Sequence, residues 1–185
     1  MTEHTSVALA AMHDDTHASR RRRRPATAAV GLFAILAVFL LSACQPAPPS
    51  FPAAPFDSGN GRRIVYSVEQ QRVWWVDDAN NVVNSYLVSG RANTPRPGHY
   101  SVFSKSRHTT SLNGASRMEF MVRFTWGNSA AIGFHSIPVN RRGQPLQSEA
   151  ELGQYRSAGC IRQRYADAAG LYDFAHVGTA VVVVK

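Results

Sequence analysis

Short runs of apolar residues separated by turn residues cover the chain from about residue 63 to its end, and this pattern predicts strands. Runs rich in Val, Ile, Tyr, Phe and Trp predict strands at 63–69, 72–77, 82–89, 100–104, 118–126, 130–134 and 180–184. The last run, AVVVV, is apolar throughout, which is typical of a strand in the middle of a sheet. One helix is predicted after residue 166, with Asp167 as its N-cap, ending near Ala175. We therefore expect a mainly β protein, a β-sandwich with one short helix.

Three local patterns add detail to this expectation. The segment 105–114 is polar and turn-like, and its Asn113-Gly114 pair is a hairpin signal. The polar segment 139–156 is long for a loop in a compact domain, so we expect it to form a wall of a substrate groove. Trp74 and Trp75 are adjacent, so in a strand one faces the core and the other the opposite surface; the second is a candidate for a substrate groove.

The first 43 residues have the features of an export signal. Five arginines, Arg20–Arg24, precede sixteen uncharged residues (26–41), which is short for a membrane-spanning helix and typical of a signal peptide. The sequence then reads Leu-Ser-Ala-Cys, which resembles a bacterial lipobox, so Cys44 is the expected site of lipidation. The alternative is an uncleaved membrane anchor with an incidental cysteine. Residues 44–58 are rich in Pro and Ala and predict a semi-rigid linker, which leaves 59–185 as one domain.

The chain is basic, with 20 Lys and Arg against 12 Asp and Glu and a net charge of +8. Removing five basic and three acidic residues with the signal leaves 15 against 9, a net charge of +6. Such a surface attracts polyanions. Because the N-terminus predicts export, we expect anionic lipid headgroups or wall polymers as neighbours, and no nucleic acid.

The candidate chemistry lies in Arg156–Arg162 (RSAGCIR) and in a histidine 25 residues before its cysteine. Cys160 is one of only two cysteines, and it has no evident disulfide partner once Cys44 is assigned to lipidation. Flanking arginines can lower a thiol pKa and favour the nucleophilic thiolate. His135 ends an apolar run (AAIGF), where strand ends commonly carry functional residues. A cysteine with a separate histidine is a candidate nucleophile and base.

These residues resemble the L,D-transpeptidase catalytic domain family (YkuD-like), whose members carry a His-Gly or His-Ser element followed by Ser-His-Gly-Cys-Val/Ile-Arg. The resemblance covers about residues 63–185 and implies a sandwich-like fold without a cofactor. It also implies that Cys160 attacks a peptidoglycan stem tetrapeptide and releases the terminal D-alanine. An amine of a neighbouring stem then takes the acyl group from the thioester to form a 3→3 cross-link. The expected partners are therefore donor and acceptor stems, and a lipid-anchored monomer at the outer face of the cell membrane is expected.

Supporting roles follow from the same motif. We expect main-chain N–H groups near Gly159 to stabilise the oxyanion and Ser157 to orient the loop. Arg162 holds either the loop or a substrate carboxylate, with a surface salt bridge as its alternative. The resemblance suggests that Ser136 orients the imidazole through its main-chain carbonyl. The sequence contains no ligand spacing suited to zinc.

Two departures from the family pattern stand out. Position 158 is Ala where the family usually has His, and the interval between His135 and Cys160 is long.

Alternative functions remain open at this point. Water as acceptor would make an L,D-carboxypeptidase, and an amine on a protein would make a wall-protein ligase. NlpC/P60 peptidases place Cys before His, and sortases lack Ser-x-Gly-Cys. The alternative from another class is a non-enzymatic wall-binding lipoprotein.

Overall fold

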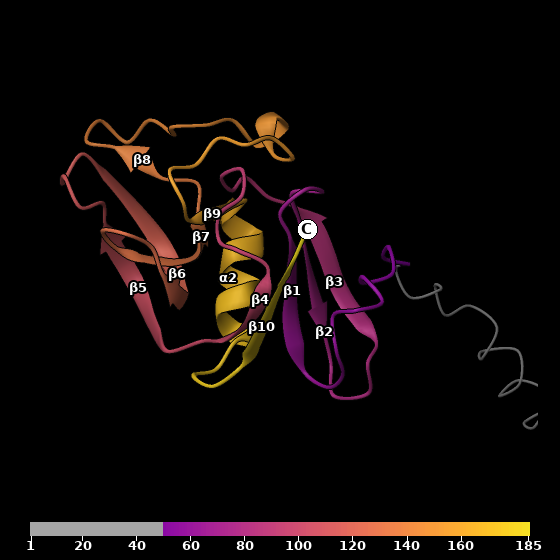
Figure 1. The fold of residues 1–185 in the computed structure, drawn as a ribbon. Coiled ribbons are helices and arrows are strands. Elements are labelled where there is room, and N and C mark those ends of the chain that lie inside the picture. Colours follow the sequence, from indigo (N-terminus) through magenta and orange to yellow (C-terminus); the bar gives the residue numbers. More distant parts are fainter. Residues whose placement is uncertain (1–49) are drawn as a thin grey trace, which may run out of the picture. The chain divides into compact units, whose positions relative to one another are not determined.

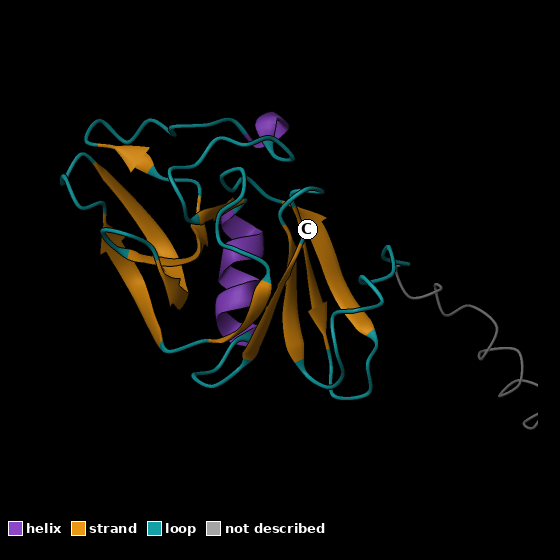
Figure 2. Ribbon diagram, in the orientation of Figure 1, coloured by secondary structure: helices purple, strands orange, loops and turns teal. Residues whose placement is uncertain are grey.

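The computed structural model describes residues 50–185, so the predicted signal and Cys44 lie outside the described residues. Ten strands, one α-helix and one short 3-10 helix make up this part of the chain (Figures 1 and 2). Their bounds are β1 Arg63–Ser67, β2 Arg72–Val76, β3 Val82–Leu87, β4 Gly98–Ser101, β5 Ser104–Thr110, β6 Ser116–Trp126, β7 Ala131–Ser136, β8 Val139–Asn140, η2 Glu149–Glu151, β9 Ile161–Gln163, α2 Tyr165–Phe174 and β10 Ala180–Val184.

The strands form two mixed sheets. Sheet A has the order β3-β2-β1-β10-β4, and sheet B has the order β5-β6-β7-β9, with β8 beside β6. Each sheet contains one parallel pair, β1 with β10 and β7 with β9. The apolar run of β10 lies between β1 and β4, as its composition predicted. The mainly β architecture with a single helix is therefore confirmed.

Helix α2 lies between the two sheets (Figure 1) and contributes to the core that joins them. Leu171 is fully buried, and Phe174 stacks on Trp75 of β2 with 5.4 Å between ring centroids. Gly170 allows this packing, because a Cβ there would lie 2.7 Å from the Trp75 ring. The helix thus holds sheet A at a fixed position against sheet B.

The outer face of sheet A is covered by residues 50–58, which we call the N-terminal strap. Trp74 is 1% exposed, and its indole N–H donates to the Pro52 carbonyl at 2.9 Å. Ala54 packs on the same small apolar cluster. The sequence assigned these residues to the linker, but they are part of the folded domain. The two tryptophans do face opposite sides of the sheet, as predicted. Trp74 lies under the strap, and the partly buried Trp75 packs against Tyr86 and Phe174, so both side chains have a packing role.

Sequence reasoning missed strand β5, because it is polar on both faces. The prediction of a turn-like segment over 105–114 was wrong: 104–110 pair with β6 at the edge of sheet B. An edge strand exposes much of its surface, so polar side chains cost little there. The turn itself is confirmed as a hairpin, in which the N–H of Ser111 donates to the carbonyl of Ser116 at 2.9 Å.

Smaller differences occur near the candidate residues. Strand β7 continues through Ser136, so His135 lies inside the strand and not after it. Helix α2 begins at Tyr165 with Arg164 as N-cap, and Asp167 lies in its first turn, where it pairs with Arg164 at 3.1 Å. The segment 139–156 contains β8 and η2, so it is less irregular than predicted. Within residues 50–185, no helix has the length and apolar character needed to cross a bilayer.

Candidate active site

Two parallel strands of sheet B carry the candidate nucleophile and base. In the register of β7 with β9, Phe134 pairs with Ile161 and His135 pairs with Arg162. Phe134 and Ile161 are fully buried in the core. Because side chains alternate along a strand, His135 and Arg162 project from the other face. Cys160 immediately precedes β9, and its sulfur contacts the main chain of β7 at the Ala131 carbonyl oxygen. We call the surface of sheet B that carries His135 and Arg162 the site face.

Gly133 allows β7 to approach β6 closely near the thiol. It lies opposite Arg123 of β6, two residues before His135. A Cβ at position 133 would lie 2.3 Å from the Val122 carbonyl oxygen, so only glycine fits. Its main-chain N–H also hydrogen-bonds to the Cys160 sulfur and lowers the thiol pKa. The sequence pattern gave no signal for this contact.

The His135 imidazole is 3% exposed and held in one orientation. Its Nδ1 lies 2.6 Å from the Ser136 carbonyl oxygen, the contact that the family resemblance suggested for Ser136. A carbonyl can only accept, so Nδ1 carries the proton and Nε2 is left with a free lone pair. Burial lowers the pKa of His135 to about 4, partly opposed by the Ser136 hydrogen bond, and the Arg162 and Arg123 charges lower it further. The imidazole is therefore neutral at pH 7.

The Cys160 thiol is half-buried, and its sulfur lies 3.7 Å from the Ala131 carbonyl oxygen. Burial raises its pKa, and this outweighs the Gly133 N–H and the charges of Arg123 and Arg162, which lower it. The sequence predicted that flanking arginines would favour the thiolate. Arg162 acts in that direction, but the net shift is the opposite one, because desolvation disfavours a buried charge. At neutral pH the Cys160 thiol and the His135 imidazole are thus both uncharged.

Arg162 is held by a buried polar network that the sequence did not reveal. Its guanidinium NH1 donates to Gln147 Oε1 at 3.3 Å, and the Gln147 amide donates to Ser89 Oγ at 2.6 Å. The main chains of Ser89 and Arg162 also exchange two hydrogen bonds of 2.9 and 2.8 Å. This environment excludes the surface salt bridge considered for Arg162. The network joins the segment after β8 to the strand that follows the cysteine.

Gly90 holds the loop that precedes Cys160 in place through main-chain hydrogen bonds. Its carbonyl accepts hydrogen bonds from the N–H groups of Arg156 and Ser157 at 3.1 and 3.0 Å. A Cβ at Gly90 would lie 2.1 Å from the Tyr66 hydroxyl, so the approach requires glycine. Ser157 Oγ in turn accepts from the Gly159 N–H at 3.0 Å. This is the loop-orienting contact that we expected of Ser157.

Residue Ala158 stands where the family usually has histidine, and an arginine lies beside it. The guanidinium of Arg91 donates to the Ala158 carbonyl at 3.3 Å. Arg123, which affects both the thiol and the imidazole, is oriented by the hydroxyls of Ser106 and Thr109 on β5. Two cationic side chains that the motif did not identify, Arg91 and Arg123, therefore flank the cysteine. The positive character of the site face exceeds what the motif alone predicted.

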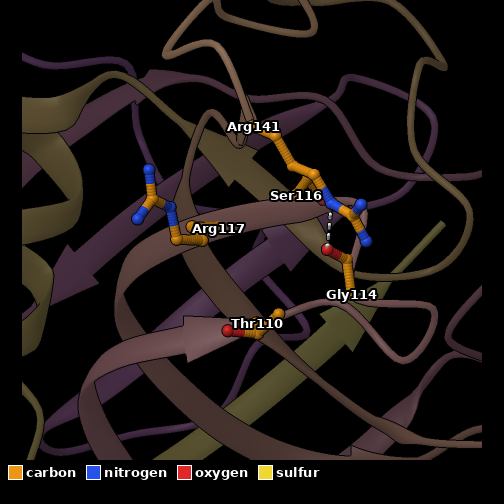
Figure 3. Close-up of a pocket in the computed structure, with 5 residues that line it drawn as sticks. All are labelled: Thr110, Gly114, Ser116, Arg117 and Arg141. Atoms are coloured by element: carbon orange, nitrogen blue, oxygen red, sulfur yellow. Dashed lines mark hydrogen bonds between the residues drawn. The ribbon is translucent and has the colours of Figure 1, made fainter.

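A separate cavity of about 220 Å³ lies at the other end of sheet B (Figure 3). It is lined by Arg117 and Arg141 together with Thr110, Gly114 and Ser116, and Arg141 Nε donates to the Gly114 carbonyl at 3.3 Å. Neither Cys160 nor His135 lines it. Among the described residues there is no cluster of three His, Cys, Asp or Glu side chains that could hold a metal ion.

The fold and the site define a class of protein. The model of the YkuD family, the L,D-transpeptidase catalytic domain, matches residues 61–183 of this chain. The chain therefore belongs to that family. A protein of Bacillus subtilis (strain 168) named "Putative L,D-transpeptidase YciB" is 27% identical over 126 residues, which cover 65% of this chain and 64% of that protein.

Solved structures show the same fold. The structure of LdtMt1 in complex with imipenem matches with a TM-score of 0.55 at 22% identity. The match covers 68% of this chain and 60% of the LdtMt1 chain. An L,D-transpeptidase from Mycobacterium smegmatis has a TM-score of 0.54 at 20% identity, covering 69% and 60%. One from Xylanimonas cellulosilytica DSM 15894 has a TM-score of 0.54 at 18% identity, covering 73% and 65%. The chain thus spans less than two thirds of the length of these relatives.

Proposed function

We propose that this chain is a peptidoglycan L,D-transpeptidase that forms 3→3 cross-links through a thioester on Cys160, with His135 as general base. One observation supports the proposal: β7, which carries His135, pairs in parallel with β9, which begins directly after Cys160. Membership of the L,D-transpeptidase family supplies the substrate class, a stem tetrapeptide ending in D-alanine. No metal or cofactor takes part in this chemistry.

The first half-reaction begins from the neutral pair. His135 Nε2 takes the proton of Cys160 as the sulfur attacks the carbonyl carbon between the L-centre of the third stem residue and D-alanine. The tetrahedral intermediate collapses, the C–N bond breaks, and the imidazolium returns the proton to the departing amine of D-alanine. A thioester between the stem and Cys160 remains.

The second half-reaction repeats these steps with a new nucleophile. A side-chain amine of a neighbouring stem attacks the thioester and passes a proton to His135, and the C–S bond breaks. The leaving sulfur takes the proton back from the imidazolium, which restores the neutral pair. Water in place of the amine would give an L,D-carboxypeptidase, and an amine on a protein would attach that protein to the wall. The acceptor that prevails depends on which one reaches the site face.

The oxyanion needs preorganised donors, and removal of one such donor typically costs about 3 kcal/mol of transition-state stabilisation. The Gly159 N–H is engaged by Ser157 Oγ, so the Cys160 N–H is the first candidate and Gly159 the second. Arg162 lies on the same face, with its position fixed through Gln147. We assign it to a carboxylate of the stem, which a planar guanidinium binds with two parallel hydrogen bonds.

Covalent trapping tests the proposal. We expect incubation with imipenem, the ligand in the LdtMt1 structure, to add one molecule of drug to the wild-type chain in intact-mass spectra. Cys160→Ala should give no adduct, and His135→Gln should slow adduct formation by about 100-fold or more, as for loss of a general base. Release of D-alanine from a tetrapeptide is the matching activity readout. Absence of both adduct and D-alanine release would favour the non-enzymatic wall-binding alternative.

The N-terminus supports a lipid-anchored protein at the outer face of the cell membrane, acting on the wall as a monomer. Cys44 would carry the lipid, and two or more acyl chains would hold the protein stably where a single chain would not. Growth with radiolabelled palmitate should label the wild-type protein but not Cys44→Ala, while Cys160→Ala, which keeps Cys44, should label normally. An unlabelled wild-type protein would contradict lipidation.

A further inference from the structure

Two stacked aromatic rings are exposed at one end of sheet B. Trp126 is the last residue of β6, and Phe103 lies in the turn before β5. Their ring centroids are 5.5 Å apart with an interplanar angle of 10°, and their side chains are 71% and 38% exposed. We call this pair the aromatic platform. Stacking leaves one face of the indole open to solvent.

The register places the platform beside the nucleophile. Trp126 pairs with Ala131 across the β6–β7 ladder. Ala131 precedes Gly133 by two residues and His135 by four, so Ala131 and its partner Trp126 both project onto the site face. The Ala131 carbonyl oxygen is the atom 3.7 Å from the Cys160 sulfur. Trp126 therefore lies directly across the ladder from the residue whose carbonyl contacts the thiol.

The residues next to the aromatic platform have small or polar side chains. The β6–β7 turn that follows Trp126 contains Gly127, Asn128 and Ser129, all exposed. Arg123 lies two strand positions before the Thr125–Trp126 end of β6, and its main-chain carbonyl accepts from the Phe103 N–H at 2.9 Å. Two rings cannot supply the roughly 800 Å² per partner of a stable protein interface. They do match the size of a single sugar ring.

We propose that the aromatic platform is a saccharide subsite that binds an N-acetylated amino sugar of the glycan strand bearing the donor stem. The negative face of an indole attracts the positively polarised C–H bonds of a pyranose ring. The amide and hydroxyl of the adjacent turn can hydrogen-bond to the acetamido and hydroxyl groups of the sugar. This inference rests on the proposed function, because it names a second contact of the same substrate.

Distance supports this assignment. Three residues of extended stem span at most about 10 Å from the sugar attachment to the carbonyl that Cys160 attacks. Directly opposed residues in adjacent strands have Cβ atoms about 5 Å apart, and the indole extends several ångströms further. A stem running from Cys160 toward the end of β6 would therefore bring its sugar to Trp126.

The test compares two soluble donors, a free tetrapeptide and the same tetrapeptide on its disaccharide, with D-alanine release as readout. For the wild-type full chain we expect kcat/KM about tenfold higher with the disaccharide, the size of effect that one good aromatic contact gives. Trp126→Ala should reduce this ratio to about one, Phe103→Ala should reduce it partly, and Trp126→Tyr should restore part of it. Phe56→Ala removes a fully exposed aromatic side chain from the N-terminal strap and should leave the ratio unchanged.

A binding measurement separates this inference from the proposed function. Titration with an N-acetylglucosamine tetramer, which has no peptide, should change the tryptophan fluorescence of the wild type and of Cys160→Ala, but not of Trp126→Ala. If both donors are turned over and Trp126→Ala keeps the preference for the disaccharide donor, the saccharide subsite is overturned and the proposed function stands. If neither donor is turned over but the sugar titration still responds, the proposed function fails and the subsite stands. No fluorescence response together with equal use of both donors would also overturn the subsite.

Discussion

At the scale of single residues, the proposed chemistry depends on two shifted pKa values of opposite sign. Burial lowers the pKa of His135 to about 4, and burial raises the pKa of Cys160. Both shifts favour uncharged forms, so an imidazolium–thiolate pair is not the resting state. The Nδ1–H bond to the Ser136 carbonyl keeps the lone pair on Nε2. In the proposed reaction His135 therefore acts as a neutral base, and the thiol leaves its contact with the Ala131 carbonyl to attack.

This resting state predicts how Cys160 responds to pH. Alkylation by iodoacetamide requires the thiolate, and the raised pKa keeps the thiol protonated at pH 7. In a Cys44→Ser chain, whose only cysteine is Cys160, we expect slow alkylation between pH 5 and 7 and a rise only at alkaline pH. Arg162→Gln should move that rise to still higher pH, because it removes a charge that lowers the pKa of the thiol. A plateau of fast alkylation from pH 5 upward would instead show a preformed ion pair.

At the scale of elements, local composition predicts the apolar strands. It does not predict the strands that form only because a neighbouring strand pairs with them. The runs at β1, β2, β3, β6 and β10 carry their own signal, because their side chains are buried on at least one face. Strand β5 is polar and exists because β6 offers it a hydrogen-bonding edge. Strand β9 has three residues and exists because β7 and Ser89 bond to it from both sides. Pairing between distant segments leaves no periodic trace in either one.

The same reasoning explains which parts of the site could be predicted. Cys160 and His135 are predicted from their motif, and Ser136 and Ser157 make local contacts within two residues of their own position. Arg123 and Trp126 reach the site only through the β6–β7 register, which shifts between Arg123 and Thr125. This irregularity puts both side chains on the site face, where strict alternation along the strand would separate them. A sequence pattern alone cannot place such a shift.

At the scale of the whole domain, the N-terminal strap moves the boundary between linker and domain. The strap seals the outer face of sheet A over Trp74, and Ser58 at its end is fully buried and accepts a hydrogen bond from Arg63 at 3.2 Å. The proline-rich composition predicted a spacer because proline favours extended chain. Extended chain can also lie against a sheet, and here the Pro52 carbonyl gives the indole its acceptor. Residues 52–58 therefore belong to the folded domain.

The strap gives a stability prediction that separates folding from catalysis. A chain beginning at residue 59 should unfold with a free energy about 2 to 3 kcal/mol lower than one beginning at residue 50, because the Trp74 ring loses its cover and its hydrogen bond. Urea unfolding followed by fluorescence measures this difference. Trp74→Phe in the longer chain removes the hydrogen bond, worth about 1 kcal/mol, and should lose a further amount for the smaller ring in a buried position. Because the strap lies on the face of sheet A turned away from the core shared with sheet B, both chains should still form the imipenem adduct at 10 °C. Equal urea midpoints for the two chains would show that residues 50–58 act only as a linker.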